Sequence, residues 1–275
     1  MYTLNCKGRL LSLEKPVVMG ILNLTPDSFY AGSRTSVENI LQEAEKMIAQ
    51  GVAILDIGGQ STRPGSDWLS AAQEWDRLRE ALPLLCSSFP STFFSIDTFH
   101  HEVAARALEA GVHIVNDISA GRLDPEMIPL VAAAQVPFVC MHSRGTPQTM
   151  SALTSYEDII LEMTDYFIER TAACREAGIR DIILDPGLGF AKTIAQNFRV
   201  LKEFRQFHLI GCPLLLGVSR KSMVWKTLGV SAAEAGNGTT VLNAWGLERG
   251  AHILRVHDVR EAVEAIRLYE ALNNA

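Results

Sequence analysis

The chain of 275 residues lacks several features that mark particular classes of protein. Its five cysteines include no CxxC pair, and an odd number of scattered thiols argues against structural zinc and against a disulfide framework. No run rich in Lys or Arg occurs and the formal net charge is −6, which argues against nucleic acid as a partner. No apolar run reaches membrane-spanning length, and the start of the chain shows no signal-peptide pattern. We therefore expect a soluble, cytoplasmic protein with no nucleic-acid or membrane partner.

What the sequence contains is a repeated unit, in which a short apolar run precedes a stretch with helical periodicity. Eight runs have the composition of buried strands, and they span Val17–Leu22, Ile54–Ile57, Phe93–Asp97, Val112–Asp117, Val136–His142, Asp181–Asp185, Pro213–Ser219 and Ala251–Asp258. Helical spacing follows each run, over about 36–50, 70–85, 101–110, 124–135, 156–177, 194–207, 223–228 with 238–249, and 259–273. This alternation predicts parallel strands joined by right-handed crossovers. Eight such units in 275 residues predict a single (β/α)₈ TIM barrel.

The remaining segments add little to this barrel. Residues 2–14 alternate loosely in polarity and predict a short N-terminal hairpin, so we expect one domain over 1–275 with its barrel over about 17–273. A doubly wound open sheet is the alternative, but no GxGxxG motif follows the first predicted strand. Two helix starts show the spacing of capping pairs, Ser70 with Gln73 and Asp258 with Glu261.

Polar side chains end the predicted strands, whereas the strand beginnings are apolar. The polar ends are Asn23, the Thr62–Arg63 loop, Asp97, Asn116 or Asp117, His142, Asp185, Lys221, and Arg255 with His257. In a barrel of parallel strands these ends share one rim, and that rim holds the active site. Asp97 and Asp185 each end a nearly all-apolar run, and Arg255 stands between two apolar residues. Because an unpaired buried charge is costly, we interpret these three residues as functional.

Three of the rim residues are hydrogen-bond acceptors. Asp97, Asn116 and Asp185 offer carboxylate or amide oxygens, and the amide can also donate. Carboxylates at a fixed separation can pair with the edge of a ring that resembles an aminopyrimidinone, through parallel N–H···O bonds. These residues predict that a flat polar ring is one part of the substrate.

Four other rim residues, Arg63, Lys221, Arg255 and His257, are cations or hydrogen-bond donors. Four such groups at one rim predict an anionic substrate, most simply a phosphate or a diphosphate. Asn23 and nearby oxygens could hold Mg²⁺ through waters, because Mg²⁺ usually combines few protein ligands with substrate phosphates. The alternative for Asn23 is a cap at the end of its strand.

At several places these residues form motifs that resemble the dihydropteroate synthase family. The matching segments are Gly20–Phe29 (GILNLTPDSF), Gly58–Gly65 (GGQSTRPG), Ser95–Thr98 (SIDT), Asn116–Ser119 (NDIS), Leu184–Phe190 (LDPGLGF), Ser219–Ser222 (SRKS) and Arg255–Val259 (RVHDV). They follow the order of that family from about Val18 to Val259, and their combination is highly specific.

The resemblance implies a reaction in which (7,8-dihydropterin-6-yl)methyl diphosphate condenses with 4-aminobenzoate, releasing diphosphate and forming 7,8-dihydropteroate for folate biosynthesis. It implies that the pterin is held by Asp97, Asn116, Asp185 and Lys221. It implies that the diphosphate and its Mg²⁺ face Asn23, Thr62, Arg63, Arg255 and His257. It implies that the 4-aminobenzoate pocket is lined by Arg63, Pro64, Phe190, Lys221 and Ser222. The usual assembly of the family is a homodimer.

The charges expected at the rim suit this reaction. Mg²⁺, Arg255 and His257 would neutralise the departing diphosphate, while Asp97 and Asp185 would stabilise cationic character on the pterin methylene group. The predicted catalytic set is therefore Asp97, Asp185, Lys221, Arg255 and His257. The amine needs little activation against such a cation, so no Ser or Cys nucleophile is expected.

Two departures from the family pattern fall in the first two loops. Gln60 stands where many family members have Glu, and Tyr30-Ala31 stand where the family often has an acidic residue followed by glycine. Two other functions stay open on the sequence alone. One is a barrel that moves a methyl group from a folate to a corrinoid protein, and the other is a barrel that binds pterin without turnover.

Overall fold

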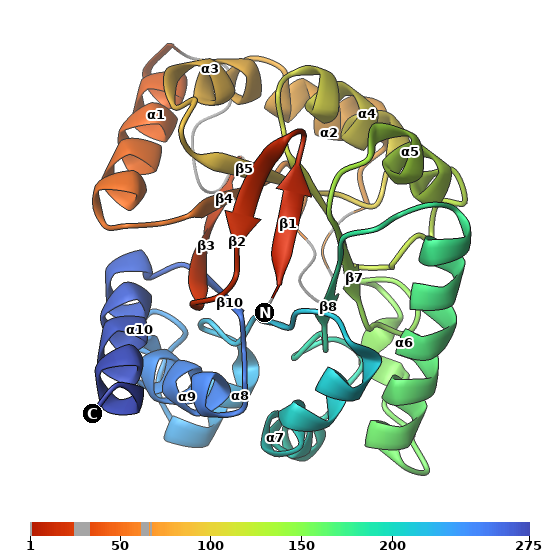
Figure 1. The fold of residues 1–275 in the computed structure, drawn as a ribbon, viewed down its shortest axis with the longest axis vertical. Coiled ribbons are helices and arrows are strands. Elements are labelled where there is room, and N and C mark those ends of the chain that lie inside the picture. The colour runs from red at the N-terminus through yellow and green to blue at the C-terminus, as the bar shows by residue number, and fades with distance from the viewer. Residues whose placement is uncertain (1, 25–33, 62–65, 67) are drawn as a thin grey trace.

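Eight parallel strands form a barrel at the centre of the molecule (Figure 1). The computed structural model describes residues 2–24, 34–61, 66 and 68–275. The barrel strands are β3 (Val17–Asn23), β4 (Ile54–Gly58), β5 (Phe93–Asp97), β6 (Ile114–Asp117), β7 (Phe138–Met141), β8 (Ile182–Asp185), β9 (Leu215–Leu216) and β10 (Ile253–Val256). They pair in the order β8-β7-β6-β5-β4-β3-β10-β9, and a parallel bridge between Leu184 and Leu214 closes the ring. The predicted (β/α)₈ barrel is confirmed.

Helices surround this barrel on its outside (Figure 1). They are α1 (Arg34–Ala49), α2 (Ala71–Leu78), α3 (Ala81–Ser88), α4 (His101–Glu109), α5 (Met127–Ala134), α6 (Ile159–Glu176), α7 (Ile194–Lys202), α8 (Ser222–Leu228), α9 (Gly236–Glu248) and α10 (Val259–Asn273), with 3₁₀ turns η1 (Met150–Ala152) and η2 (Phe204–Ile210). Among the helices of the described residues, none combines the length and the apolar character needed to cross a membrane.

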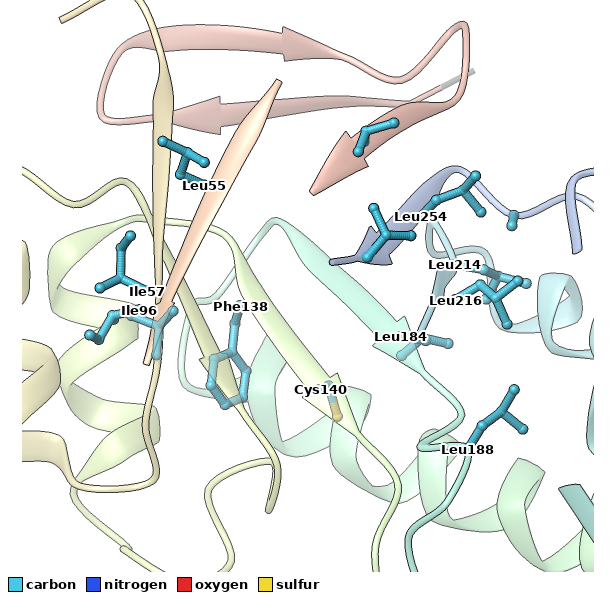
Figure 2. Close-up of a cluster of buried hydrophobic side chains, with 14 of the residues drawn as sticks. Leu55, Ile57, Ile96, Phe138, Cys140, Leu184, Leu188, Leu214, Leu216 and Leu254 are labelled. Carbon is cyan, nitrogen blue, oxygen red and sulfur yellow. The ribbon is translucent and has the colours of Figure 1, made fainter. Parts of the chain in front are cut away.

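Alternation along each strand divides its side chains between two apolar layers. On β4, Leu55 and Ile57 belong to the large cluster that joins the strands to the helices, whereas Ile54 belongs to a smaller cluster inside the barrel. Figure 2 shows part of the outer layer, in which Phe138 of β7 and Leu184 of β8 lie among residues of neighbouring strands. Residues two apart on a strand therefore share one side of the barrel wall, and this sets which polar groups can face the interior.

The N-terminal hairpin closes one end of the barrel. Strands β1 (Thr3–Cys6) and β2 (Arg9–Ser12) pair antiparallel, as the sequence predicts. The apolar side of the hairpin packs against the first inward-facing residues of the strands in one buried cluster, made of Leu4, Cys6, Leu11, Leu13, Met19, Ile54, Ile114, Val139, Ile183, Leu215 and Ile253. This end of the barrel is therefore apolar and sealed, which leaves the opposite end for the site.

The helical stretch predicted over 70–85 is divided into α2 and α3 between Arg79 and Glu80. Pro83 explains the break, because proline has no N–H to donate to the carbonyl of Arg79 and its ring would clash with that carbonyl. Pro83 is tolerated where it stands, in the first turn of α3.

One of the two predicted capping pairs is confirmed and the other is wrong. Ser70 and Gln73 form a capping box, in which the Gln73 N–H donates to Ser70 Oγ at 3.3 Å. The Asp258 carboxylate instead accepts from Nε and Nη2 of Arg220, at 2.9 and 2.7 Å. An arginine fork satisfies that carboxylate better than a backbone N–H does. Asp258 therefore pairs with Arg220 in the loop after β9 and makes no side-chain cap to α10.

Candidate active site

The sheet register brings polar residues from neighbouring strands to one level at the open end of the barrel. Asn23 pairs with Gly58, Gly58 with Asp97, and Asp97 with Asn116. Asp56 precedes Gly58 by two residues, so both face the same side of the wall. Because the inward-facing residues at the other end are apolar, the polarity inside the barrel changes sharply along the strands.

Arg255 of β10 joins the acidic residues into one buried cluster. Its Nε donates to Asp56 Oδ2 at 2.6 Å, and its Nη2 donates to Asp97 Oδ2 at 2.5 Å. Asn116 Nδ2 also donates to Asp56 Oδ2, at 3.0 Å. The carboxylates are almost completely buried, with Asp56 0% and Asp97 7% exposed. Such charges are tolerated in the interior only because arginine and amide donors satisfy them.

The cluster still has hydrogen-bonding capacity to spare. Among the described residues, Oδ1 of Asp56 and Oδ1 of Asp97 have no hydrogen-bond partner. A buried carboxylate oxygen without a donor is costly, and a ligand that brings N–H groups would satisfy it. The two open carboxylate oxygens, of Asp56 and Asp97, therefore make the floor of the site an acceptor surface.

Asp185 and Lys221 form a second charged pair, at the ends of the strands that follow β10 around the barrel. A Cβ added to Gly217 would lie 3.7 Å from Lys221 Nζ and 3.9 Å from Asp185 Oδ2, so both charged ends approach this one glycine. Lys221 Nζ donates to the carbonyl oxygen of Leu188 and lies 4.9 Å from the centre of the Phe190 ring. The pair thus connects the loop after β8 with the start of α8.

Burial brings the pKa values of two of these groups close to neutral pH. Burial raises the pKa of Asp97 to about 7, although Arg255 opposes the rise. Burial also raises the pKa of Asp185, which Lys221 opposes. Burial lowers the pKa of Lys221 to about 8, against the effect of Asp185. Burial would lower the pKa of Arg255 too, but Asp56 and Asp97 outweigh it and hold that pKa above its ordinary value. Such poised groups are typical of catalytic sites.

His257 lies just beyond the end of β10, beside Ser219. Ser219 Oγ lies 3.0 Å from His257 Nδ1 and accepts the backbone N–H of His257 at 3.1 Å. Ser222, which the resemblance assigns to the 4-aminobenzoate pocket, is the first residue of α8, next to Lys221. The predicted residues Thr62, Arg63 and Pro64 lie outside the described residues, as do Tyr30 and Ala31.

Two residues named at the rim do not face the interior. The sequence left Asn116 and Asp117 as alternatives, and alternation turns Asn116 inward, where it binds Asp56. Asp117 instead accepts from the backbone N–H groups of Ser119 and Gly121, both at 2.7 Å, and so shapes its own loop. His142 lies two residues after Cys140, which faces outward from β7, so His142 faces outward as well. Its ring packs edge-on against Tyr166 of α6, with 4.8 Å between the ring centres.

Sequence reasoning missed Asp56, although a signal was available. Asp56 stands between Leu55 and Ile57 in an apolar strand, which is the same observation that identified Asp97, Asp185 and Arg255 as functional. The structure makes Asp56 the common partner of Arg255 and Asn116.

The fold and the cluster define a class of protein, a (β/α)₈-barrel enzyme with buried acceptors on its floor and cations near its rim. The chain also matches the family model "Pterin binding enzyme" over residues 19–257. It is 39% identical over 272 residues to dihydropteroate synthase of Escherichia coli K12, which covers 98% of this chain and 96% of that protein.

Solved structures agree with this relative. Dihydropteroate synthase of Xanthomonas albilineans with 4-aminobenzoic acid is 35% identical with a TM-score of 0.92, covering 99% of this chain and 98% of that chain. The Yersinia pestis enzyme in a sulfonamide drug complex is 36% identical with a TM-score of 0.93, covering 100% of both chains. The chain belongs to the pterin-binding enzymes and, within them, to the dihydropteroate synthases, which are transferases of folate biosynthesis.

Proposed function

We propose that this chain condenses (7,8-dihydropterin-6-yl)methyl diphosphate with 4-aminobenzoate, releasing diphosphate and forming 7,8-dihydropteroate. The observation that carries the proposal is the buried cluster of Asp56, Asp97, Asn116 and Arg255, which leaves carboxylate oxygens open to N–H donors. A pterin offers such donors along the edge of its pyrimidinone ring. The name of the Xanthomonas relative's structure, which includes 4-aminobenzoic acid, supports the second substrate.

Asp97, Asn116 and Asp185 hold the pterin ring in this proposal, and Lys221 lies beside it. Asp56 is added to the predicted set, because it fixes both Arg255 and Asn116. A ring held by several hydrogen bonds presents its methylene carbon in one direction, which lowers the entropic part of the barrier.

The reaction replaces one bond at that methylene carbon. The C–O bond to the diphosphate breaks and its electron pair leaves with the diphosphate. The lone pair of the aromatic amine forms the new C–N bond, and the amine nitrogen then loses a proton. Fixed negative charge on Asp97 and Asp185 stabilises the cationic character of the carbon, while Arg255 and His257 stabilise the leaving group.

Mg²⁺ is the cofactor that we propose, with Asn23 as its protein ligand. Asn23 ends β3, and a Cβ on the neighbouring Gly58 would lie 3.3 Å from Asn23 Oδ1. Among the described residues, no group of three or more His, Cys, Asp or Glu side chains could form a metal cage. A single amide oxygen suits Mg²⁺, which takes most of its remaining ligands from water and phosphate. When bound, it would neutralise diphosphate charge.

The second substrate lies between the loop after β8 and the start of α8. Phe190, Lys221 and Ser222 line this pocket in the proposal, with Arg63 and Pro64 from the second loop. The Lys221 ammonium beside the Phe190 ring can bind the carboxylate of 4-aminobenzoate, while the two aromatic rings pack together.

The cellular setting and the assembly are proposed with the reaction. Four of the five thiols are buried and all five are unpaired, as suits a reducing cytoplasm. A homodimer is proposed from the family resemblance, and Leu228, Val241 and Trp245 offer exposed apolar surface on α8 and α9. Sedimentation analysis at micromolar concentration measures the assembly, and a monomer would contradict the dimer.

The reaction is tested by incubating the purified protein with dihydropterin methyl diphosphate, 4-aminobenzoate and Mg²⁺, and measuring diphosphate and dihydropteroate. We expect equal amounts of both products. Diphosphate release without dihydropteroate would contradict the condensation. Pterin binding without any release would favour a barrel that has lost turnover, and methyl transfer from a methylated folate to a corrinoid protein would favour the methyltransferase.

A further inference from the structure

Lys192 buries a charged group inside the loop that joins β8 to α7. Only 8% of the residue is exposed. Its Nζ donates to the carbonyl oxygens of Gly187 and Phe190, at 3.0 and 3.1 Å, and lies 2.9 Å from Nδ1 of His142. Burial lowers the pKa of Lys192 well below its ordinary value, and these contacts favour the ammonium form, which has three N–H donors where a neutral amine has two. The group is fully used within the protein and has no part in the reaction proposed above.

His142 is a rigid partner for Lys192. With the ammonium group as the donor to Nδ1, the neutral imidazole carries its proton on Nε2. Burial and the charge of Lys192 hold the pKa of His142 well below its ordinary value. The ring packs against Tyr166, whose hydroxyl donates to the carbonyl oxygen of Met141 at 2.9 Å. The anchor of Lys192 is therefore part of the packing between β7 and α6.

The loop held by Lys192 has an unusual backbone. Gly187, Gly189 and Ala191 all have positive φ, of 63°, 87° and 47°. An alanine in this region is strained and persists only where neighbouring contacts fix it. A Cβ on Gly187 would lie 2.1 Å from the carbonyl oxygen of His142, so the turn is pressed directly against the end of β7.

Two lysines hold opposite sides of this turn. The carbonyls of Gly187 and Phe190 point to Lys192, while the carbonyl of Leu188, between them, accepts from Lys221. The Phe190 ring lies against Lys221, with Nζ 4.9 Å from the ring centre. A shift of the turn would move both the aromatic ring and the ammonium group.

We propose that Lys192 is a positioning residue for the 4-aminobenzoate side of the site, acting through the turn of residues 187–190 on Phe190 and Lys221. This inference rests on the function proposed above, which places these two residues against 4-aminobenzoate. The pterin acceptors Asp56 and Asp97 are held by Arg255 on another part of the barrel. The third pterin acceptor, Asp185, also contacts the turn, because it accepts the Gly187 N–H at 2.7 Å. Phe190, however, is part of the turn itself, so loss of Lys192 acts more strongly on the second substrate than on the pterin.

The test compares K192M, which keeps the length of the side chain and removes its donors, with K202M, which changes an exposed lysine of α7. We expect K192M to raise the KM for 4-aminobenzoate at least tenfold and to lower kcat, while the calorimetric Kd for a pterin ligand rises by a clearly smaller factor, less than fivefold. K202M should match the parent in all three quantities. K192R retains the charge and the donors, and it should restore most of the affinity for 4-aminobenzoate.

Several results would overturn the inference. They are an unchanged KM for 4-aminobenzoate in K192M, equal losses of pterin and 4-aminobenzoate binding, and no recovery in folded K192R. Thermal unfolding is measured first, and if K192M is unfolded at the assay temperature, K192Q takes its place with the same expected split. If neither folds, Lys192 serves stability and the inference is wrong. A parent protein without turnover would instead contradict the proposed function.

Discussion

Glu74 and Asp97 are buried carboxyl groups of different character. Asp97 has Arg255 as a charged partner. Glu74 of α2 is 0% exposed and receives one hydrogen bond, from Thr98 Oγ1 at 3.0 Å, while its Oε1 has no partner among the described residues. Burial raises the pKa of Glu74 to about 8. A carboxyl group that is protonated at neutral pH behaves as a neutral hydrogen-bonding side chain.

This difference predicts how the stability of E74Q depends on pH. The ordinary pKa of Glu74 is 4.5 and the folded value is about 8, so the folded state holds more protons between these values. Wild-type stability therefore falls as pH rises from about 4.5 to about 8, and the neutral glutamine removes this loss. We expect E74Q to gain stability relative to the parent by a few kcal/mol between pH 5 and pH 8.5, measured by urea unfolding. The control is E80Q at an exposed position, and a pH-independent difference for E74Q would contradict the assignment.

Asp97 leads to a prediction about ligand binding. D97N keeps the shape of the side chain but removes the negative charge that receives the pterin N–H groups. We expect its Kd for a pterin ligand to rise by about ten- to a hundredfold, as for loss of a hydrogen bond to a charged group. In the parent, affinity should fall as pH decreases through about 7, because Asp97 becomes protonated there. Calorimetry over pH 5.5–8.5 measures both effects, with exposed D76N as the control. Unchanged affinity in D97N would contradict the role.

At the scale of elements, strand parity decides what each polar residue does. Asn116 and Asp117 are neighbours in sequence, yet Asn116 binds Asp56 inside the barrel and Asp117 holds its own loop. The period of two along a strand is enough to distinguish them. The end of β7 shows the same effect, because His142 faces outward and meets Lys192 and α6.

The hairpin is the element whose contribution to stability can be tested most cleanly. Leu11 is 6% exposed and packs into the apolar cluster that closes the barrel, whereas its neighbour Leu10 is 70% exposed on the other side of β2. We expect L11A to lower the free energy of unfolding by about 2–4 kcal/mol, since it removes buried methyl groups and leaves a cavity. L10A should stay within about 0.5 kcal/mol of the parent. Equal effects in urea unfolding would show that the hairpin does not seal the barrel.

At the scale of the whole molecule, the barrel has one weak seam. Strand β9 has only two residues, pairs with β10 through two register positions, and meets the β8 side through a single bridge between Leu184 and Leu214. Asp185 lies at the end of β8 and Lys221 follows β9, so a ligand that binds both residues spans this seam.

Binding of a pterin ligand should therefore stabilise the seam more than other parts of the wall. We expect amide hydrogen exchange over 213–219 to be faster than over β4 in the free protein, and to slow most when the ligand is added. At a hundredfold excess over Kd, the ligand should add about 2.7 kcal/mol to the free energy of unfolding. Peptides of the β1–β2 hairpin are the internal control. Uniform protection across the barrel would contradict a weak seam.

Sequence by itself determined the strand–helix alternation, the barrel, and most of the strand ends that carry polar groups. It could do so because apolar periodicity and turn residues are local signals, and because parallel strands must end together. Local signals also found the Ser70 cap, but they could not show that the Asp258 carboxylate would bind Arg220 from another loop.

Only the tertiary structure decided which charges meet. Arg255 and Asp56 are 199 residues apart in the chain and 2.6 Å apart in space, and Lys192 reaches the ring of His142 across 50 residues. Such pairs arise from strand order, register and the closure of the barrel, which no window of sequence contains. Because burying an unpaired charge is costly, each of these buried charged groups must lie against a partner that satisfies it.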